Sequence, residues 1–350
     1  MSSNAVILLT AMMCAAACAL LGSFLILRRM AMMTDAISHA ILPGLVFGFW
    51  ISNGSNLITG AIGATIAALL TVTMVEALGR TKRVDGGSAM GIVFPAMFAL
   101  GTVLVSRYFS EVHLDADAIL MGNIEFSVFD RLEIGGNDLG PRSLWIMGAL
   151  VVMNVGFLAL FFKELKLTTF DPALAAAFGF MPVVLNYMLM AVLSVTTVGA
   201  FTAVGAILVV ALVIVPCATA YLLTDRLGLM IGLSVAIGAS SAWLGFQFAL
   251  WQDVSVSGSM AASTGLLFLL ALLFSPSEGA IAKIQRTRTN KQRFAIDLLL
   301  VHLMTHDGTQ ERGPESTLGH ISAALRWSPT QASTAIGRAV NRGLILTAGG

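Results

Sequence analysis

Long apolar segments recur along most of this chain and leave few folds open to it. A helix needs about 20 mainly apolar residues to cross the hydrocarbon core of a bilayer. Only 11% of the 350 residues are charged, against about 25% in a soluble domain. We therefore expect an all-α fold, a polytopic transmembrane helix bundle. The predicted spans cover residues 5–26, 31–50, 57–78, 89–106, 143–162, 183–199, 203–223, 227–249 and 256–275.

The charges of the loops predict the orientation of these spans. Cytoplasmic loops carry an excess of Lys and Arg, and here every second loop is basic, whereas loops 51–56 and 250–255 contain neither residue. The apolar stretch 183–223 could form one span or two. The alternation of basic and non-basic loops favours two, which gives nine spans rather than eight. The N-terminus is then outside and the C-terminus cytoplasmic. Loop 107–142 departs from the rule. The basic residues are Arg28, Arg29, Arg80, Lys82, Arg83, Lys163, Lys166, Arg226, Lys283, Arg286, Arg288, Lys291 and Arg293.

The second span carries a polar pair, Asp35 and His39, next to an apolar run. Their four-residue spacing puts both on one helix face, about 6 Å apart along the axis. A carboxylate and an imidazole inside a spanning helix are costly unless they face a polar pathway or a partner. Both groups are ligands for manganese, iron and zinc. The pair predicts a metal site, and the alternative is that Asp35 caps the helix while His39 bonds a neighbour.

Pro43 and Gly44 follow the pair by one helical turn. Proline cannot donate the backbone hydrogen bond to the His39 carbonyl, so we expect a kink that opens space beside the pair. Two ligands do not complete a coordination shell. If two chains face each other across a two-fold axis, four oxygen and nitrogen ligands converge. The pattern therefore predicts a dimeric channel.

ATP hydrolysis is not expected of this chain. The sequence contains no phosphate-binding loop of the form GxxxxGK[ST] and no metalloprotease-type HExxH. We predict that the chain is not an enzyme and that pumping requires a separate ATPase.

A short helix is predicted inside the cytoplasmic loop 163–182. Asp171 and Pro172 form a helix start, and Gly179 forms a stop. We interpret this segment, with Ala175 and Ala176 at its centre, as a docking helix for the partner ATPase.

Composition changes near residue 280. We divide the chain into a permease domain, 1–280, and a small cytoplasmic domain, 281–350, whose amphipathic helices and Ser328–Pro329 turn look like a helix-turn-helix, with 343–346 starting a wing. His302 and His306, with Asp307 or His320, could sense metal, although burial on an amphipathic helix also explains them. Arg338 and Arg342 are few cations for DNA binding, so DNA is not an expected partner.

Four motifs in order resemble one family: TDAISHAILPGL, LDADAILMGNIEF, FDPALAAAFG and VGAILVVALVIVPCATAYLL. They are similar to the permeases of the manganese, zinc and iron ABC importers, the ABC-3 family, over about residues 5–280. The resemblance implies a bacterial plasma membrane, ABC ATPase subunits, an external metal-binding protein and a second permease chain, identical or paralogous. It implies transported manganese, zinc or iron and no permanently bound cofactor, with the family's second-span ligands at Asp35 and His39.

The resemblance also places the coupling helix at 171–179, and the outer-loop motif favours manganese. Residues 246–258 depart from the family pattern, as does the tail, which looks like a winged helix found in a manganese-transporter subset. Two other functions stay open: a secondary metal transporter working without an ATPase, and a membrane-tethered, metal-responsive regulator. Membrane lipid surrounds the spans in each case.

Overall fold

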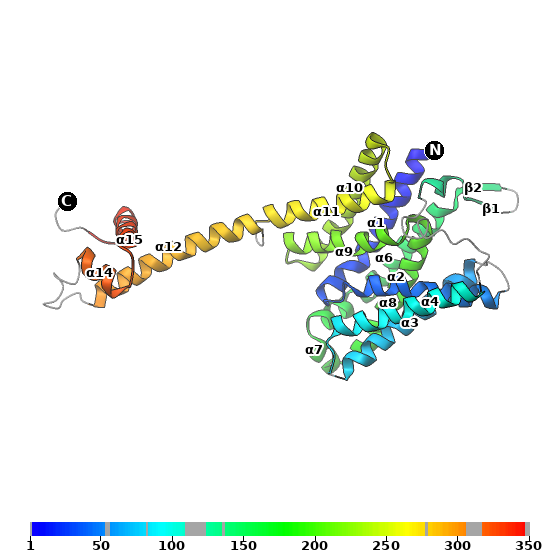
Figure 1. The fold of residues 1–350 in the computed structure, drawn as a ribbon, viewed down its shortest axis with the longest axis horizontal. Coiled ribbons are helices and arrows are strands. Elements are labelled where there is room, and N and C mark those ends of the chain that lie inside the picture. The colour runs from blue at the N-terminus through cyan, green and yellow to red at the C-terminus, as the bar shows by residue number, and fades with distance from the viewer. Residues whose placement is uncertain are drawn as a thin grey trace. The chain divides into compact units, whose positions relative to one another are not determined.

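Two compact units, Met1–Leu272 and Leu273–Gly350, make up the protein in a computed structural model (Figure 1). The structure describes residues 2–52, 57–81, 83–108, 124–134, 137–276, 279–305 and 317–346. We propose that the second unit contains the tail domain predicted for residues 281–350.

Helices dominate the first unit, and each apolar segment of the sequence forms one. The helices are α1 (Ser3–Leu27), α2 (Met33–Ile51), α3 (Leu57–Arg80), α4 (Gly86–Tyr108), α6 (Arg142–Phe170), α7 (Pro172–Ala177), α8 (Pro182–Val204), α9 (Ala206–Leu223), α10 (Leu227–Gln252) and α11 (Val256–Phe274). A 3-10 turn, η1 (Ile124–Val128), precedes a small antiparallel hairpin of β1 (Arg131–Ile134) and β2 (Asn137–Pro141).

Among the described residues, nine helices are long and apolar enough to cross a membrane: all of the above except α7. The predicted transmembrane bundle is confirmed, and nine is the higher of the two predicted span counts. The 183–223 stretch divides at Gly205, the single residue between α8 and α9, whose φ of +83° favours glycine. Loop residues 109–123, which include His113 and most of the predicted outer motif, lie outside the described residues.

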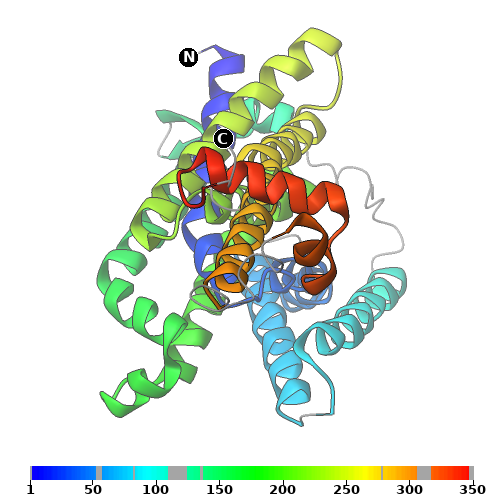
Figure 2. The ribbon, with the colours of Figure 1, turned by 90° about the vertical axis from the view of Figure 1, so that its left-hand side faces the viewer.

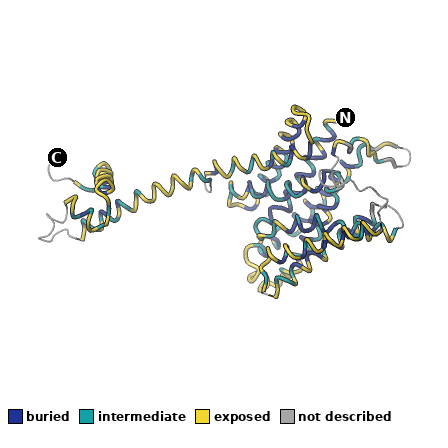
Figure 3. The backbone as a smooth tube through the Cα atoms, viewed as in Figure 1, coloured by how far each residue is buried: buried dark blue, intermediate teal, exposed yellow. Residues whose placement is uncertain are grey.

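Helix α1 forms the centre of the first unit and packs against α6, α8, α9 and α10. Buried residues recur along the helix from Val6 to Leu25. Figure 3 shows the buried residues of the protein in dark blue. Small residues allow the close approach: a methyl group added at Gly22 would lie 2.0 Å from the Val213 carbonyl oxygen on α9. Close packing of small residues is a common way for helices to associate in lipid.

A second group of helices, α2, α3 and α4, packs mainly within itself (Figures 1 and 2). It meets the α1 group mainly through α8, which contacts α1, α2, α3 and α6, and also where α2 contacts α9. Helix α8 therefore packs against both groups.

The second unit contains α12 (Ala280–Thr305), α14 (Leu318–Ala324) and α15 (Pro329–Asn341). The end of α12 packs on α14 and α15, and Ser328 and Gln331 form a reciprocal capping box at the start of α15. Residues 343–346, where a wing was expected to begin, hold a turn and irregular chain. The winged-helix assignment therefore stays a prediction. The buried residues are Ile296, Leu299, Ile321, Ala332, Ala335 and Ala339.

Candidate metal site and ATPase-docking helix

Asp35 and His39 lie where the spacing predicted, on one face at the start of α2. The His39 Nε2 and Asp35 Oδ1 atoms are 3.6 Å apart, and the side chains are 28% and 36% exposed, respectively. Two ligands held at about 2.1 Å by one ion lie roughly 3.0–3.4 Å apart. A small side-chain movement would thus let both atoms bind one ion.

Asp35 does not act as a side-chain cap of α2. The N-cap is Met32, without a side-chain cap hydrogen bond. The Met33 and Thr34 N–H groups donate to the carbonyl oxygens of Met30 and Ala31. The capping alternative therefore lacks its expected hydrogen bond, and the described partner of Asp35 is His39.

Two phenylalanines of α4 enclose the imidazole of His39. The ring centroids of Phe94 and Phe98 lie 4.7 Å and 5.4 Å from that of His39, with Phe98 edge-on. Aromatic rings in such arrangements attract each other and restrict side-chain rotation. Sequence reasoning missed both residues, because nothing in the apolar run of α4 marks which phenylalanines face α2.

Glycines hold α2 tightly against its two neighbours. A methyl group added at Gly44 would lie 2.3 Å from the Gly63 carbonyl oxygen on α3, and one added at Gly101 on α4 would lie 2.8 Å from Pro43 Cδ. Helix α2 is continuous from Met33 to Ile51 with Pro43 inside it, so a kink at Pro43 stays a prediction. Pro43 and Gly44, where the kink was predicted, contact the neighbouring helices α4 and α3, respectively.

Within the described part of the chain, no group of three or more His, Cys, Asp or Glu side chains could hold a metal ion. The described residues therefore bring no third side chain of this kind to Asp35 and His39. In the second unit, the rings of His302 and His320 stack with centroids 5.5 Å apart. His306 and Asp307, the other predicted sensor residues, lie outside the described residues, so metal sensing by the tail stays a prediction.

Helix α7 forms where the docking helix was predicted. The Asp171 side chain accepts a hydrogen bond of 2.9 Å from the Leu174 N–H, Pro172 opens the helix, and Gly179 follows it with a φ of +85°. Ala175 is fully buried whereas Ala176 is exposed. Large apolar side chains stand exposed around α7: Phe170, Leu174, Phe178, Phe180 and Met181.

Arg28 has a structural role that its position in a basic loop did not reveal. Its guanidinium donates to Thr169 Oγ1 at 3.0 Å, Thr168 Oγ1 at 3.0 Å and Asn186 Oδ1 at 2.9 Å. Burial lowers the pKa of Arg28, yet arginine stays protonated in proteins. The positive-inside rule explained its charge, and only the tertiary structure shows its partners.

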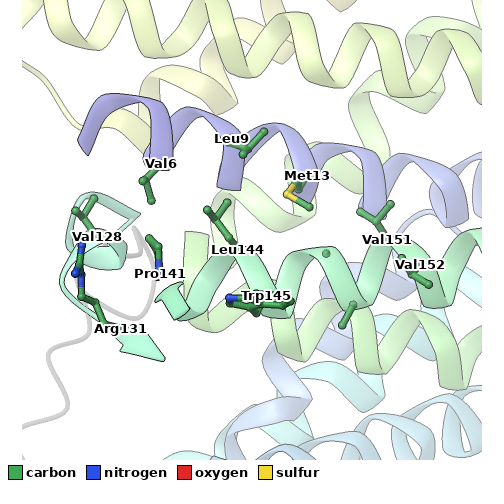
Figure 4. A pocket seen from close by; sticks show the side chains of 13 residues that line it. Val6, Leu9, Met13, Val128, Arg131, Pro141, Leu144, Trp145, Val151 and Val152 are labelled. Carbon is green, nitrogen blue, oxygen red and sulfur yellow. The ribbon is translucent and has the colours of Figure 1, made fainter. Parts of the chain in front are cut away.

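A cavity of about 870 Å³ lies away from the Asp35–His39 pair, between α1, α6 and the β-hairpin (Figure 4). Its walls are apolar apart from Arg131 and Trp145, which Figure 4 shows on the hairpin and on α6. None of its lining residues is among the predicted metal ligands.

Comparison with known proteins places the whole first unit in one family. Residues 3–275 match the ABC 3 transport family. The chain is 43% identical over 339 residues to the zinc transport system membrane protein TroD of Treponema pallidum, covering 97% of this chain and 92% of that protein. It is 44% identical over 287 residues to the manganese transport system membrane protein MntD of Bacillus subtilis, covering 82% and 97%.

A solved structure has the same fold. PsaBC from Streptococcus pneumoniae in complex with Fab gives a TM-score of 0.65 at 30% identity, and the match covers 79% of this chain and 94% of that one. On the family match and these relatives, the chain belongs to the ABC 3 transport family.

Proposed function

We propose that this chain is the membrane-spanning permease subunit of an ATP-driven importer of divalent metal ions. Permeases of the ABC 3 family work with a separate ATPase and a solute-binding protein in a bacterial plasma membrane. The observation that carries the proposal is the Asp35–His39 pair, an oxygen and a nitrogen ligand on one spanning helix. This membership favours the ABC importer over a secondary transporter.

Two chains would complete the metal site. Asp35 and His39 are each about one-third exposed in the single chain, so the pair is open on one side. A second permease chain, identical or paralogous, that places its own pair there would bring the total to two carboxylates and two imidazoles. Four such ligands suit manganese, iron or zinc. The ion is cargo, held transiently on its way through the channel.

Manganese is the favoured cargo, with zinc and iron as alternatives. The relative of 44% identity is named for manganese and that of 43% for zinc. The donor atoms of the pair do not separate these ions, because carboxylate and imidazole bind each of them.

Helix α7 would dock the ATPase on the cytoplasmic side. Its exposed apolar residues, Leu174 and Phe178 among them, suit a pocket on a partner protein, since buried apolar anchors carry much of the energy of interfaces. This orientation rests on the alternation of basic loops and puts the N-terminus outside and the C-terminus in the cytoplasm.

Equilibrium binding of radioactive manganese to the purified permease–ATPase complex tests the proposed site. We expect one ion for every two permease chains. Loss of a group that only hydrogen-bonds to a metal ligand lowers metal affinity by roughly 10–100-fold. His39→Ala removes a ligand itself, so it should weaken manganese binding by at least as much. Asp225→Asn, which neutralises an exposed carboxylate outside the pair, should bind normally. Unchanged affinity in His39→Ala, or one ion on every chain, would exclude a shared site.

A further inference from the structure

The start of α8, just after the proposed docking helix α7, is joined by hydrogen bonds to α1 and, through Arg28, to α6. Asn186 on α8 accepts a 2.9 Å hydrogen bond from Arg28 Nη1, directly after α1. The same guanidinium donates to Thr168 and Thr169 at the end of α6. Arg28 therefore joins α1 to the two helices, α6 and α8, that flank α7.

Geometry explains why arginine suits this position. Its planar fork presents donors in fixed directions, so three acceptors on two helices can be held together, which the single ammonium of lysine cannot reproduce. All three acceptors are neutral side chains, and Arg28 is partly buried. The contact is thus directional, unlike the apolar helix packing around it.

Helix α8 also packs against α2 and α3 of the other helix group. In this contact Val198 of α8 is buried with Ile41 of α2 and Ala64 of α3. Helix α3 in turn packs against α2 through Gly44 and Gly63, and α2 carries the metal ligands.

We propose that Arg28, Asn186, Thr168 and Thr169 form a polar junction that transmits displacement of α7, by way of α8, to the helices holding Asp35 and His39. The proposal rests on the docking role proposed for α7. Arg28 is a positioning residue in this scheme. Because hydrogen bonds depend on direction, the junction keeps α8 in register with α1 and α6 when α7 moves. The apolar contact of α8 with α2 and α3 then carries the ATP-driven motion to the metal site.

The test measures manganese uptake and ATP hydrolysis in the same proteoliposomes, with ATPase association measured separately. Arg28→Gln should lower the number of ions moved per ATP by about tenfold, within the range that residues between coupled sites reach, while the ATPase still binds and hydrolyses ATP. Arg28→Lys should fall nearly as far. Lys163→Gln, which removes an exposed cation near the end of α6, is the matched control and should stay coupled.

Asn186→Ala provides a second variant that leaves the arginine in place, and it should also uncouple. The double variant Arg28→Gln/Asn186→Ala should be no worse than the poorer single variant, because both remove the same contact. A normal number of ions moved per ATP in both single variants would overturn the junction. So would a double variant whose loss equals the product of the two single losses. Loss of ATPase association in Arg28→Gln would equally overturn it, since the residue would then be part of docking. Failure of α7 docking itself would instead appear as normal ATPase association in Ala176→Glu.

Discussion

At the scale of single residues, Gly44 lies where the backbones of α2 and α3 come into close contact. An added methyl group would meet the Gly63 carbonyl oxygen at 2.3 Å, so Gly44→Ala must push the two backbones apart. Overpacking of this kind typically costs about 1–3 kcal/mol. We expect a lower thermal midpoint and a smaller folded yield for the purified permease.

Gly91→Ala is the matched control, because no atom lies within 4 Å of a methyl group added there on α4. Alanine should stabilise that helix by roughly 0.5–1 kcal/mol. The two identical substitutions should therefore shift the thermal midpoint in opposite directions. Equal shifts of the thermal midpoint in the two variants would contradict the close α2–α3 contact at Gly44.

The close placement of Asp35 and His39 could be predicted from the sequence, but the surroundings of the pair could not. A four-residue spacing on a helix is a local property, which is why Asp35 and His39 were found together. Phe94, Phe98 and Gly63 lie near the pair but belong to other helices. A single sequence does not say which helix faces pack against each other. Arg28 was missed for the same reason: its partners lie on α6 and α8.

At the scale of elements, two neighbouring alanines of α7 that the sequence did not distinguish differ in burial. Ala176 is exposed and Ala175 fully buried. Ala176→Glu should leave the permease folded and weaken ATPase association by at least about tenfold, because a charge would enter an apolar interface. Ala175→Glu should instead lower the folded yield, since it buries an unpaired carboxylate. Co-purification of the ATPase checks both, and full association in Ala176→Glu would remove α7 as the docking element.

The helices themselves were predictable because each spanning segment must satisfy its backbone groups internally. Apolar runs of sufficient length therefore become helices. Residues 183–223 form two helices, as the predicted spans 183–199 and 203–223 required, although the division falls at Gly205. The small β-hairpin was not foreseen. Its strands are short, and the ion pair between Arg131 and Asp138 joins residues seven positions apart.

At the scale of the whole molecule, the orientation in the membrane is open to direct labelling. In a chain with Cys14, Cys18 and Cys217 replaced by alanine, Ser52→Cys should react with an impermeant thiol reagent added to intact cells, and Thr81→Cys should react only after lysis. The alternation of basic loops gives this expectation. Labelling of Thr81→Cys in intact cells would reverse the proposed orientation.

Manganese uptake by cells carrying Asp35→Asn tests the central claim most directly. Asparagine keeps the shape of the side chain and caps helices about as well as aspartate, but it removes the charge that balances a divalent ion. Uptake should fall to background while the amount of complex in the membrane holds or rises, because removing a partly buried charge removes its desolvation cost. Asp225→Asn should transport normally. Near-normal manganese and zinc uptake by Asp35→Asn would contradict a metal site at this pair.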